Sequence, residues 1–469
     1  MKRILIVLVA LVTASFPLSS KADQPPNVIL FLADDLGWTG LSCFGSDFYE
    51  TPNLDRLADE GMKFTDAYAA CTVCSPTRAS IMTGRYPGRL HLTSFIPGQD
   101  RPFAKTMIPD WTKGLDSEYT TLAEAFKDHG YRTIHVGKWH LNFPDERPDP
   151  TQHGFDFSED SPPGTRGFFL SDKTAQELGR KTNHLTDHFA ELAVEQIEKA
   201  GDDPFFLYFA FRVPHTPIQG RQDLVEYFEN KVDPDAIHRN PTYAAMVKSM
   251  DLAVGSVLDA LDEQGIADNT LVVFTSDNGG LTQRYGVHDE FTENLPLRRG
   301  KGSAYEGGVR VPWIVKWPGV TNAGSACSEP VMTIDLYPTL LDAAGKSVDP
   351  ADVDGANLIP LLNNPSSTLD RDLFWHFPHY HAGGDSPYTA IRSDNWRLIE
   401  FHEDHSLELY DLENDIGEST NVAADNPETA AALHKKIKQW RRDVAAQMPT
   451  NNPAYDPDRA TELAKRKRN

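Results

Sequence analysis

Four short apolar segments, each followed at once by polar residues, constrain the fold of this 469-residue chain more than any other feature. They span residues 27–32, 133–136, 205–211 and 271–274, and helical patterns over 51–61, 121–130, 186–200 and 243–264 alternate with them. Unbroken apolar strands are typical of a sheet covered on both faces, and their alternation with helices favours a parallel arrangement. The sequence therefore predicts an α/β fold with a large, mostly parallel mixed sheet between layers of helices.

Polar side chains with acid–base or ligating groups follow each of these four strands. They are Asp34 and Asp35, Lys138 and His140, His215, and Asp277 and Asn278, in the order of the strands. In open α/β sheets, ligands bind beyond the carboxyl ends of the strands. We therefore expect all seven side chains to gather at one edge of the sheet and to form the functional site.

The C-terminal part of the chain has a different pattern. Residues 390–398, 400–402 and 407–412 resemble short strands joined by polar turns, and residues 427–446 have a helical period. This pattern predicts a smaller antiparallel α+β domain. We divide the chain into residues 1–22, a main α/β domain over 23–365, and a C-terminal domain over 366–469.

The N-terminus has the pattern of a secretory signal peptide. Lys2 and Arg3 precede an apolar run over residues 4–12, and small and polar residues lead to Ala22. The apolar run is short for a membrane anchor, so cleavage near Ala22 is favoured. No other segment is long and apolar enough to span a membrane. The pattern predicts an exported protein, periplasmic or extracellular.

The net charge and the cysteines limit the partners and the chemistry. A formal charge of −23 disfavours nucleic acid, and it disfavours anionic substrates unless basic residues gather in a pocket. The four cysteines, Cys43, Cys71, Cys74 and Cys327, would allow one or two disulfides in an exported protein, but their number does not decide the pairing.

Four of the polar residues form a candidate metal site. Asp34, Asp35, Asp277 and Asn278 offer only hard oxygen ligands, which suit Ca²⁺ and, less well, Mg²⁺. Each acid alone would more simply be a helix cap or a turn residue. Their position after two strands favours metal binding.

The segment from Cys71 to Arg78, with the sequence CTVCSPTR, is the candidate centre of the chemistry. Pro76 fits the first position of a helix with Ser75 as its cap, so Cys74 would lie beside a helix N-terminus that lowers a thiol pKa. Three interpretations compete: a capped helix with buried cysteines, a redox pair of Cys71 with Cys74, and a nucleophile site. The acid-rich strand ends and the absence of a small thioredoxin-sized unit argue against the redox pair.

These motifs together resemble the type I sulfatases of the alkaline phosphatase-like superfamily. The residues that carry the resemblance are Cys74-Ser-Pro-Thr-Arg78 with Thr83-Gly-Arg85, the pair Asp34-Asp35, Gly137-Lys-Trp-His140, Pro214-His215, Asp277-Asn-Gly279, and Gly300-Lys-Gly302 with Tyr305-Glu-Gly-Gly308. The resemblance implies that a dedicated maturation enzyme, a formylglycine-generating or sulfatase-maturating enzyme, oxidises Cys74 to formylglycine. It also implies hydrolysis of sulfate esters, with the calcium site formed by the four oxygen ligands.

The same resemblance implies roles for the remaining residues. Residue 74 would act as a hydrated aldehyde, with one hydroxyl attacking sulfur and the second expelling sulfate on deprotonation. His140 would be the base for that elimination, and His215 with Lys301 would protonate or stabilise the departing oxygen. Lys138 and Arg78 would hold sulfate and the oxygens of residue 74.

The alcohol part of the substrate is less constrained. His376, His379, His381 and Arg392 cluster in the sequence near the start of the C-terminal domain, where they could bind sugar or form a polar surface loop. The loops over 93–101 and 156–166 are candidate rim segments. The resemblance favours a sulfated carbohydrate, with galactose or N-acetylgalactosamine units of a polysaccharide.

Two other functions would fit parts of this pattern. A phosphomonoester or phosphodiester hydrolase of the same superfamily would more often use threonine or serine and two zinc ions. A non-catalytic sulfated-glycan binding protein would keep the pocket without turnover, but no motif residue is missing here.

Overall fold

The structure is a computed structural model that describes residues 25–142, 149–284, 287–288 and 291–464. The predicted signal peptide over 1–22 lies outside the described residues, and it stays a prediction. Among the helices described, none combines the length and the apolarity that crossing a bilayer would require.

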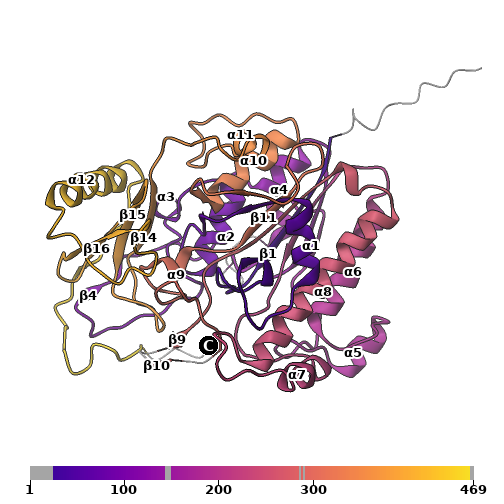
Figure 1. Ribbon diagram of the computed structural model, residues 1–469, viewed down its shortest axis with the longest axis horizontal. Helices are drawn as coiled ribbons and strands as arrows, with labels where there is room; N and C mark the ends of the chain where they lie inside the picture. Colours follow the sequence, from indigo (N-terminus) through magenta and orange to yellow (C-terminus); the bar gives the residue numbers. More distant parts are fainter. Residues whose placement is uncertain (1–24, 143–148, 285–286, 289–290, 465–469) are drawn as a thin grey trace, which may run out of the picture.

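An eight-stranded mixed sheet forms the centre of the main α/β unit (Figure 1). Its strands, in spatial order, are β12 (Ser325–Cys327), β2 (Met62–Phe64), β11 (Trp313–Lys316), β8 (Thr270–Ser276), β1 (Asn27–Ala33), β7 (Phe205–Ala210), β5 (Arg132–Gly137) and β6 (Phe157–Glu159). The five strands from β8 to β6 are parallel, and β11 runs antiparallel to both of its neighbours. The predicted mostly parallel mixed sheet is confirmed.

Helices cover both faces of this sheet, as the unbroken apolar strands predict. In β1, Ile29 and Phe31 pack in one core layer, and Val28 and Leu30 pack in the other. The first layer includes α1 (Pro52–Glu60), α6 (Leu185–Ala200) and α8 (Pro241–Glu263), and the second includes α2 (Cys74–Thr83), α4 (Leu122–Lys127) and α10 (Leu336–Ala343). Alternate side chains of a strand point to opposite faces, so a strand covered on both faces buries both sets of its side chains.

The predicted helices occur close to their expected bounds. The capping box at the start of α4 is present, because the Thr121 hydroxyl accepts a bond from the Glu124 amide and the Glu124 carboxylate accepts one from the Thr121 amide. The helix ends at Lys127, earlier than the expected Gly130.

The C-terminal unit is an antiparallel four-stranded sheet with one long helix (Figure 1). Its elements are β14 (Leu373–Phe377), β15 (Tyr388–Ser393), β16 (Trp396–Phe401), β17 (Leu407–Asp411) and α12 (Pro427–Asp443). The predicted strand over 390–398 is wrong, because Asp394 has a left-handed backbone (φ 49°) and turns the chain between β15 and β16. The strand β14 was not predicted.

The small sheet is packed on both faces. Ile391 and Leu398 lie in a core cluster with Leu433 and Ile437 of α12. The opposite face joins the main unit, where the Trp375 indole donates to the Ala69 carbonyl at 2.9 Å. The remaining short strands and α-helices are β3 (Ala67–Tyr68), α3 (Pro87–Leu90), β4 (Thr106–Met107), α5 (Asp172–Glu177), α7 (Gln222–Glu229), β9 (Gln283–Arg284), β10 (Val287–His288), α9 (Glu306–Val309), β13 (Val331–Met332), α11 (Ile359–Asn363) and β18 (Thr450–Asn451).

Candidate functional site

The four predicted strand ends meet at one edge of the main sheet. The strands β8, β1, β7 and β5 are consecutive neighbours and parallel, so the residues that follow them lie side by side. Lys301 joins them from the loop before α9 through an ion pair with Asp35. The structure therefore brings together the polar residues that the strand pattern predicted to be close.

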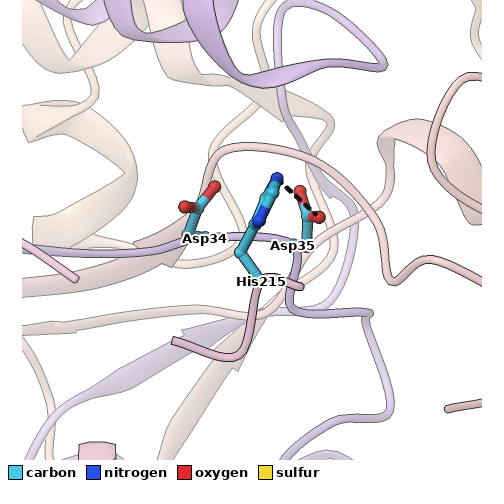
Figure 2. Close-up of side chains that lie close together, drawn as sticks. All are labelled: Asp34, Asp35 and His215. Atoms are coloured by element: carbon cyan, nitrogen blue, oxygen red, sulfur yellow. Dashed lines mark ion pairs between the residues drawn. The ribbon is translucent and has the colours of Figure 1, made fainter. Parts of the chain in front are cut away.

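Hydrogen bonds connect three of the four candidate oxygen ligands. The Asp35 amide donates to Asp277 Oδ1 at 3.1 Å, and the Asn278 side-chain amide donates to Asp35 Oδ1 at 2.8 Å. Asp34 is 1 % exposed, and Asp277 and Asn278 are fully buried. Asp34, Asp35 and His215 offer ligand atoms within 4.8 Å of one another, and so do Asp34, Cys74 and Asp277 (Figure 2 shows the first group).

Three cations neutralise the carboxylates. Lys138 Nζ lies 2.7 Å from Asp34 Oδ2, Lys301 Nζ lies 2.6 Å from Asp35 Oδ1, and Arg78 lies 2.7 Å from Asp277 Oδ2. Burial alone would raise the pKa of Asp34 and of Asp35, but the neighbouring cations, with Lys138 first for Asp34 and Lys301 first for Asp35, hold both pKa values below the usual range.

Two observations show that this donor set fits a divalent cation. Burial raises the pKa of Asp277 to about 7 despite the neighbouring Arg78, so a further positive charge beside this carboxylate would favour its ionised form. Asn278 Oδ1 is buried and has no hydrogen-bond partner among the described residues. An oxygen-binding cation would satisfy both groups.

Cys74 is the first residue of α2, which corrects the predicted helix start. Val73 is the N-cap, and Ser75 is not a cap, because its hydroxyl accepts a bond from the Ile96 amide at 3.1 Å. The thiol is 1 % exposed, and burial raises its pKa although Lys138 and Lys301 oppose the shift. Burial therefore outweighs the lowering of the thiol pKa that the helix N-terminus was expected to cause. All four cysteines, which lie in the described part of the chain, are free.

His140 is oriented toward Cys74 by a backbone contact. Its Nε2 lies 2.6 Å from the Ile96 carbonyl oxygen, which can only accept, so Nε2 carries the proton. The lone pair of Nδ1 then faces Cys74 Sγ at 3.3 Å. Burial, and after it Lys138, lowers the His140 pKa well below its usual value, so the ring is a neutral proton acceptor.

His215 points between the two acids of the first strand end (Figure 2). Its Nδ1 donates to the Thr216 carbonyl at 2.6 Å, and its Nε2 lies 3.6 Å from Asp35 Oδ2. Burial lowers the His215 pKa, and Asp35 offsets part of this effect. A proton on Nε2 would therefore give an imidazolium that Asp35 stabilises.

Arg78 does not line the cavity, contrary to the expectation that it holds the substrate. Its Nε donates to Asp277 at 2.9 Å and its Nη1 donates to the Lys138 carbonyl at 2.7 Å. The guanidinium is fully buried. It fixes a candidate ligand and the end of β5 instead.

A cavity of about 820 Å³ opens above these residues. Asp34, Cys74, Lys138, His140, His215 and Lys301 line it, and so do residues from both predicted rim loops, including Phe95, Gln99, Asp160 and Pro162. Arg212 and Asn142 also line it and were not identified from the sequence. The signal for Arg212 was its place three residues before His215, at the same strand end.

Of the four candidate substrate-binding residues, only His381 lines the cavity. His376 and His379 are buried, and His379 contacts the Thr93 hydroxyl through Nε2 at 2.8 Å. Arg392 pairs with Asp66 at 2.6 Å where the small sheet meets the main unit. The expected grouping at the cavity mouth is therefore wrong for three of the four, and the alternative of a polar surface loop is wrong as well.

His376 instead belongs to a buried chain of hydrogen bonds in the small sheet. Its Nε2 donates to the Gln447 carbonyl at 2.9 Å, so its Nδ1 accepts from the Thr389 hydroxyl at 2.8 Å. The same hydroxyl oxygen accepts from His402 Nε2 at 3.0 Å. Burial lowers the pKa of His376 to about 4 and that of His402 to about 2.

These buried histidines predict an acid-sensitive fold. The unfolded chain binds a proton on each histidine near pH 6.5, whereas folded His376 binds it only near pH 4, so stability is complete above pH 6.5 and falls between the two values. We expect His376→Asn to reduce this acid-induced decrease in the free energy of unfolding by up to about 3 kcal/mol relative to the chain without substitutions. Urea unfolding across pH 4–7 tests this. His405→Asn, in the exposed turn after β16, serves as the control, and an equal slope in both variants would contradict the prediction.

The end of β5 requires glycine. Gly137 has φ 103°, and a Cβ there would lie 1.9 Å from the Ala210 carbonyl oxygen of β7. We expect Gly137→Ala to lower the free energy of unfolding by roughly 2–4 kcal/mol and to displace Lys138 and His140. Gly130→Ala has a similar φ of 80° with no atom within 4 Å, so it should cost only the backbone strain, about 1–2 kcal/mol. Equal losses in urea unfolding would refute the steric cause.

Comparisons with known proteins agree with this geometry. The family model described as Sulfatase matches residues 26–346, and the model described as N-sulphoglucosamine sulphohydrolase, C-terminal, matches residues 300–443. A sulfatase from Formosa agariphila is 33 % identical, with 92 % of each chain covered. Human N-acetylgalactosamine-6-sulfatase is 33 % identical over 76 % of this chain and 69 % of its own length. The solved structure of Ps i-CgsB in complex with k-i-k-neocarrahexaose has a TM-score of 0.74 and 31 % identity, and covers 92 % of this chain and 95 % of that one.

Proposed function

The chain belongs to the sulfatase family and is a sulfuric ester hydrolase with an alkaline phosphatase-like fold, and from this premise we propose that it removes sulfate from a sulfated carbohydrate. We propose that the nucleophile is formylglycine made from Cys74 and that Ca²⁺ is the resident cation. The observation that carries the proposal is the contact of Cys74 with His140 beside four buried oxygen ligands.

The surroundings of residue 74 support a modified nucleophile rather than a thiolate. Burial raises the thiol pKa, so a thiolate would be costly at neutral pH. The side chain faces Asp34 and Asp277, with ligand atoms within 4.8 Å. An oxygen nucleophile at this position could join the oxygen ligands of a hard cation. A sulfur atom suits such a cation poorly. Formylglycine, when present, supplies a hydrated carbonyl carbon with two hydroxyls.

The cation would be held by Asp34, Asp35, Asp277 and Asn278, and it would supply positive charge for the sulfate oxygens and the nucleophile. The carboxylates and the nearby Arg78, Lys138 and Lys301 carry opposite charges of equal number. A divalent cation therefore makes the site net positive. This local charge supports binding of an anionic ester by a protein whose overall charge is −23.

The side chains of the cavity have distinct proposed tasks. His140 takes a proton from residue 74 at Nδ1, because the Ile96 carbonyl holds the other ring proton. Lys138 and Lys301 donate to the sulfate oxygens while they stay paired with Asp34 and Asp35. His215, with Lys301, exchanges a proton with the departing oxygen. Arg78 positions Asp277.

The names of the relatives support a carbohydrate substrate. One relative is an N-acetylgalactosamine-6-sulfatase, and one similar structure holds k-i-k-neocarrahexaose. A galactose or N-acetylgalactosamine sulfate within a polysaccharide is the proposed substrate. Of the four substrate-binding residues expected from the sequence, we retain His381 alone.

We further propose export and maturation before activity. The N-terminal pattern supports cleavage near Ala22 and a periplasmic or extracellular site. A formylglycine-generating or sulfatase-maturating enzyme would be the required partner. The division into domains over 23–365 and 366–469 stays a prediction, and the small sheet itself begins at Leu373.

The decisive experiment is mass spectrometry of the peptide around residue 74, combined with an assay for inorganic sulfate. We expect the matured protein to carry an aldehyde in place of the sulfur and to release sulfate from 4-nitrophenyl sulfate and from monosulfated sugars. A thiol in fully active protein would refute the formylglycine proposal. Failure to release sulfate from any ester would refute the function.

A phosphoester hydrolase is the second candidate, because His215 lies within 4.8 Å of Asp34 and Asp35 and could add a nitrogen ligand. Nitrogen ligands suit zinc better than calcium. Metal analysis of the purified protein separates the two candidates. One calcium supports the sulfatase mechanism, and two zinc ions with phosphate release would favour the phosphoester hydrolase.

A further inference from the structure

The cavity is also lined by an ion pair that includes none of the candidate metal ligands. Arg212 follows β7 and Asp160 follows β6, and the Arg212 guanidinium contacts the Asp160 carboxylate directly. Both residues line the cavity. The proposed reaction assigns no task to either residue.

The strand register explains why this pair lies beside the reacting groups. Gly137 at the end of β5 is paired with Ala210 of β7, and Val136 is paired with Glu159 of β6. Asp160 and Arg212 therefore flank the end of β5, on opposite sides of the segment that carries Lys138 and His140. A span of two strands is about 10 Å, which the long arginine side chain can bridge to reach Asp160.

The order of the strands gives the cavity a direction. The metal ligands follow β8 and β1, His215 and Arg212 follow β7, and Asp160 follows β6 at the edge. An ester with its sulfate beside Asp34 and Cys74 would extend its alcohol part past His215 toward β6. The alcohol part would then contact the pair of Arg212 and Asp160.

The pair offers both donors and acceptors but little net charge. The side chains are 30 % and 43 % exposed, and Arg212 Nε is buried without a hydrogen-bond partner among the described residues. A guanidinium already neutralised by a carboxylate is a weak site for a second anion. Together the two groups suit neighbouring hydroxyls, each of which can donate and accept.

The remaining wall of the cavity complements this polar pair. Phe95, Phe168, Pro162, Pro217 and Leu281 line the same space. Apolar walls with a few convergent polar groups are typical of sites for small organic ligands. A sugar ring has both features, with C–H faces for the apolar wall and hydroxyl edges for the polar pair.

We infer that Arg212 and Asp160 are specificity-determining residues that bind neighbouring hydroxyls of the sugar carrying the scissile sulfate. This inference rests on the proposed function and names the part of the cavity that selects the sugar. The selected substrate is a sulfated sugar unit with free hydroxyls beside the ester, and it needs no second anionic group.

The test compares a sugar with an aryl ester in the same matured protein. The probes are galactose 6-sulfate, N-acetylgalactosamine 6-sulfate, N-acetylgalactosamine 4-sulfate and 4-nitrophenyl sulfate, which lacks hydroxyls. The variants are Asp160→Asn, Arg212→Gln and the double variant. We expect the ratio of sugar to aryl kcat/KM to fall at least about tenfold in each single variant, and the two effects to be less than additive because the residues share one ligand.

A control and three outcomes make the test decisive. Asp259→Asn removes an exposed carboxylate that pairs with Arg56 at 2.9 Å on the outer helices, and it should change neither activity. An unchanged ratio in the Asp160 and Arg212 variants would overturn the inference.

The remaining two outcomes separate the inference from the function on which it rests. In the first, the protein cleaves 4-nitrophenyl sulfate but cleaves no sulfated sugar, and no sulfated sugar competes with the aryl ester. This result would overturn the sugar site but not the sulfatase activity. No sulfate release from the aryl ester would overturn the proposed function itself.

Discussion

Cys74→Ala is expected to reduce release of inorganic sulfate by at least about 10⁴-fold, because the substitution removes the proposed covalent nucleophile. The alanine keeps the start of α2 and leaves Lys138, Lys301 and the oxygen ligands unchanged. Binding should therefore survive. Sulfate release with 4-nitrophenyl sulfate measures the first effect, and calorimetry with a monosulfated sugar measures the second.

Cys71→Ala is the matched control for this variant. Cys71 is three residues away and 2 % exposed, but its thiol does not line the cavity. We expect its activity to stay within about threefold, with a stability loss of about 1 kcal/mol for the lost packing. Equal loss in both variants would favour a redox pair, and full turnover by Cys74→Ala would refute the nucleophile. Binding without turnover in the matured chain without substitutions would instead favour a sulfated-glycan binding protein.

Several parts of the site could be predicted from the sequence because each strand end is encoded by a short continuous segment. Each apolar segment ends in its own polar residues, and parallel pairing alone brings Asp34, Lys138, His215 and Asp277 to one edge. The adjacency of β8, β1, β7 and β5 confirms this reasoning. The sequence could not show that Arg78 is used inside the protein, because its partner Asp277 is 199 residues away.

The residues whose positions were predicted wrongly also have physical explanations. His376, His379 and Arg392 are near one another in sequence, but β14, the following loop and β15 direct them to different partners. Asp160 lies in the predicted rim segment 156–166 but was not singled out, because it follows β6, a three-residue edge strand whose residues are all partly exposed. A short, half-exposed strand has no apolar run from which its end could be read.

The second large effect concerns Asp277, whose carboxylate is both a candidate calcium ligand and the main partner of Arg78. Asp277→Asn is nearly isosteric, but it removes the charge within 2.7 Å of a fully buried guanidinium. The nearest other carboxylate, Asp34, is 3.6 Å from Arg78 and already pairs with Lys138. Breaking a buried ion pair from one side costs about 3–5 kcal/mol.

We therefore expect Asp277→Asn to lower stability by that amount, to lose bound calcium, and to release sulfate about 10³-fold more slowly, since a lost ligand removes several kcal/mol of charge stabilisation. Urea unfolding, elemental analysis and the sulfate assay measure the three effects. Asp251→Asn is the control, because Asp251 is also fully buried but pairs with Lys248 at 3.0 Å and accepts from the Asn53 and Leu54 amides, outside the cavity.

The control separates a metal ligand from a structural carboxylate. Asp251→Asn should lose stability but keep its calcium and its activity per folded molecule. Excess calcium should restore part of the activity and stability of Asp277→Asn, because a ligand that binds only the folded state stabilises it by mass action. If Asp277→Asn kept its full calcium content, Asp277 would serve Arg78 alone, and the cation would have to be held without it.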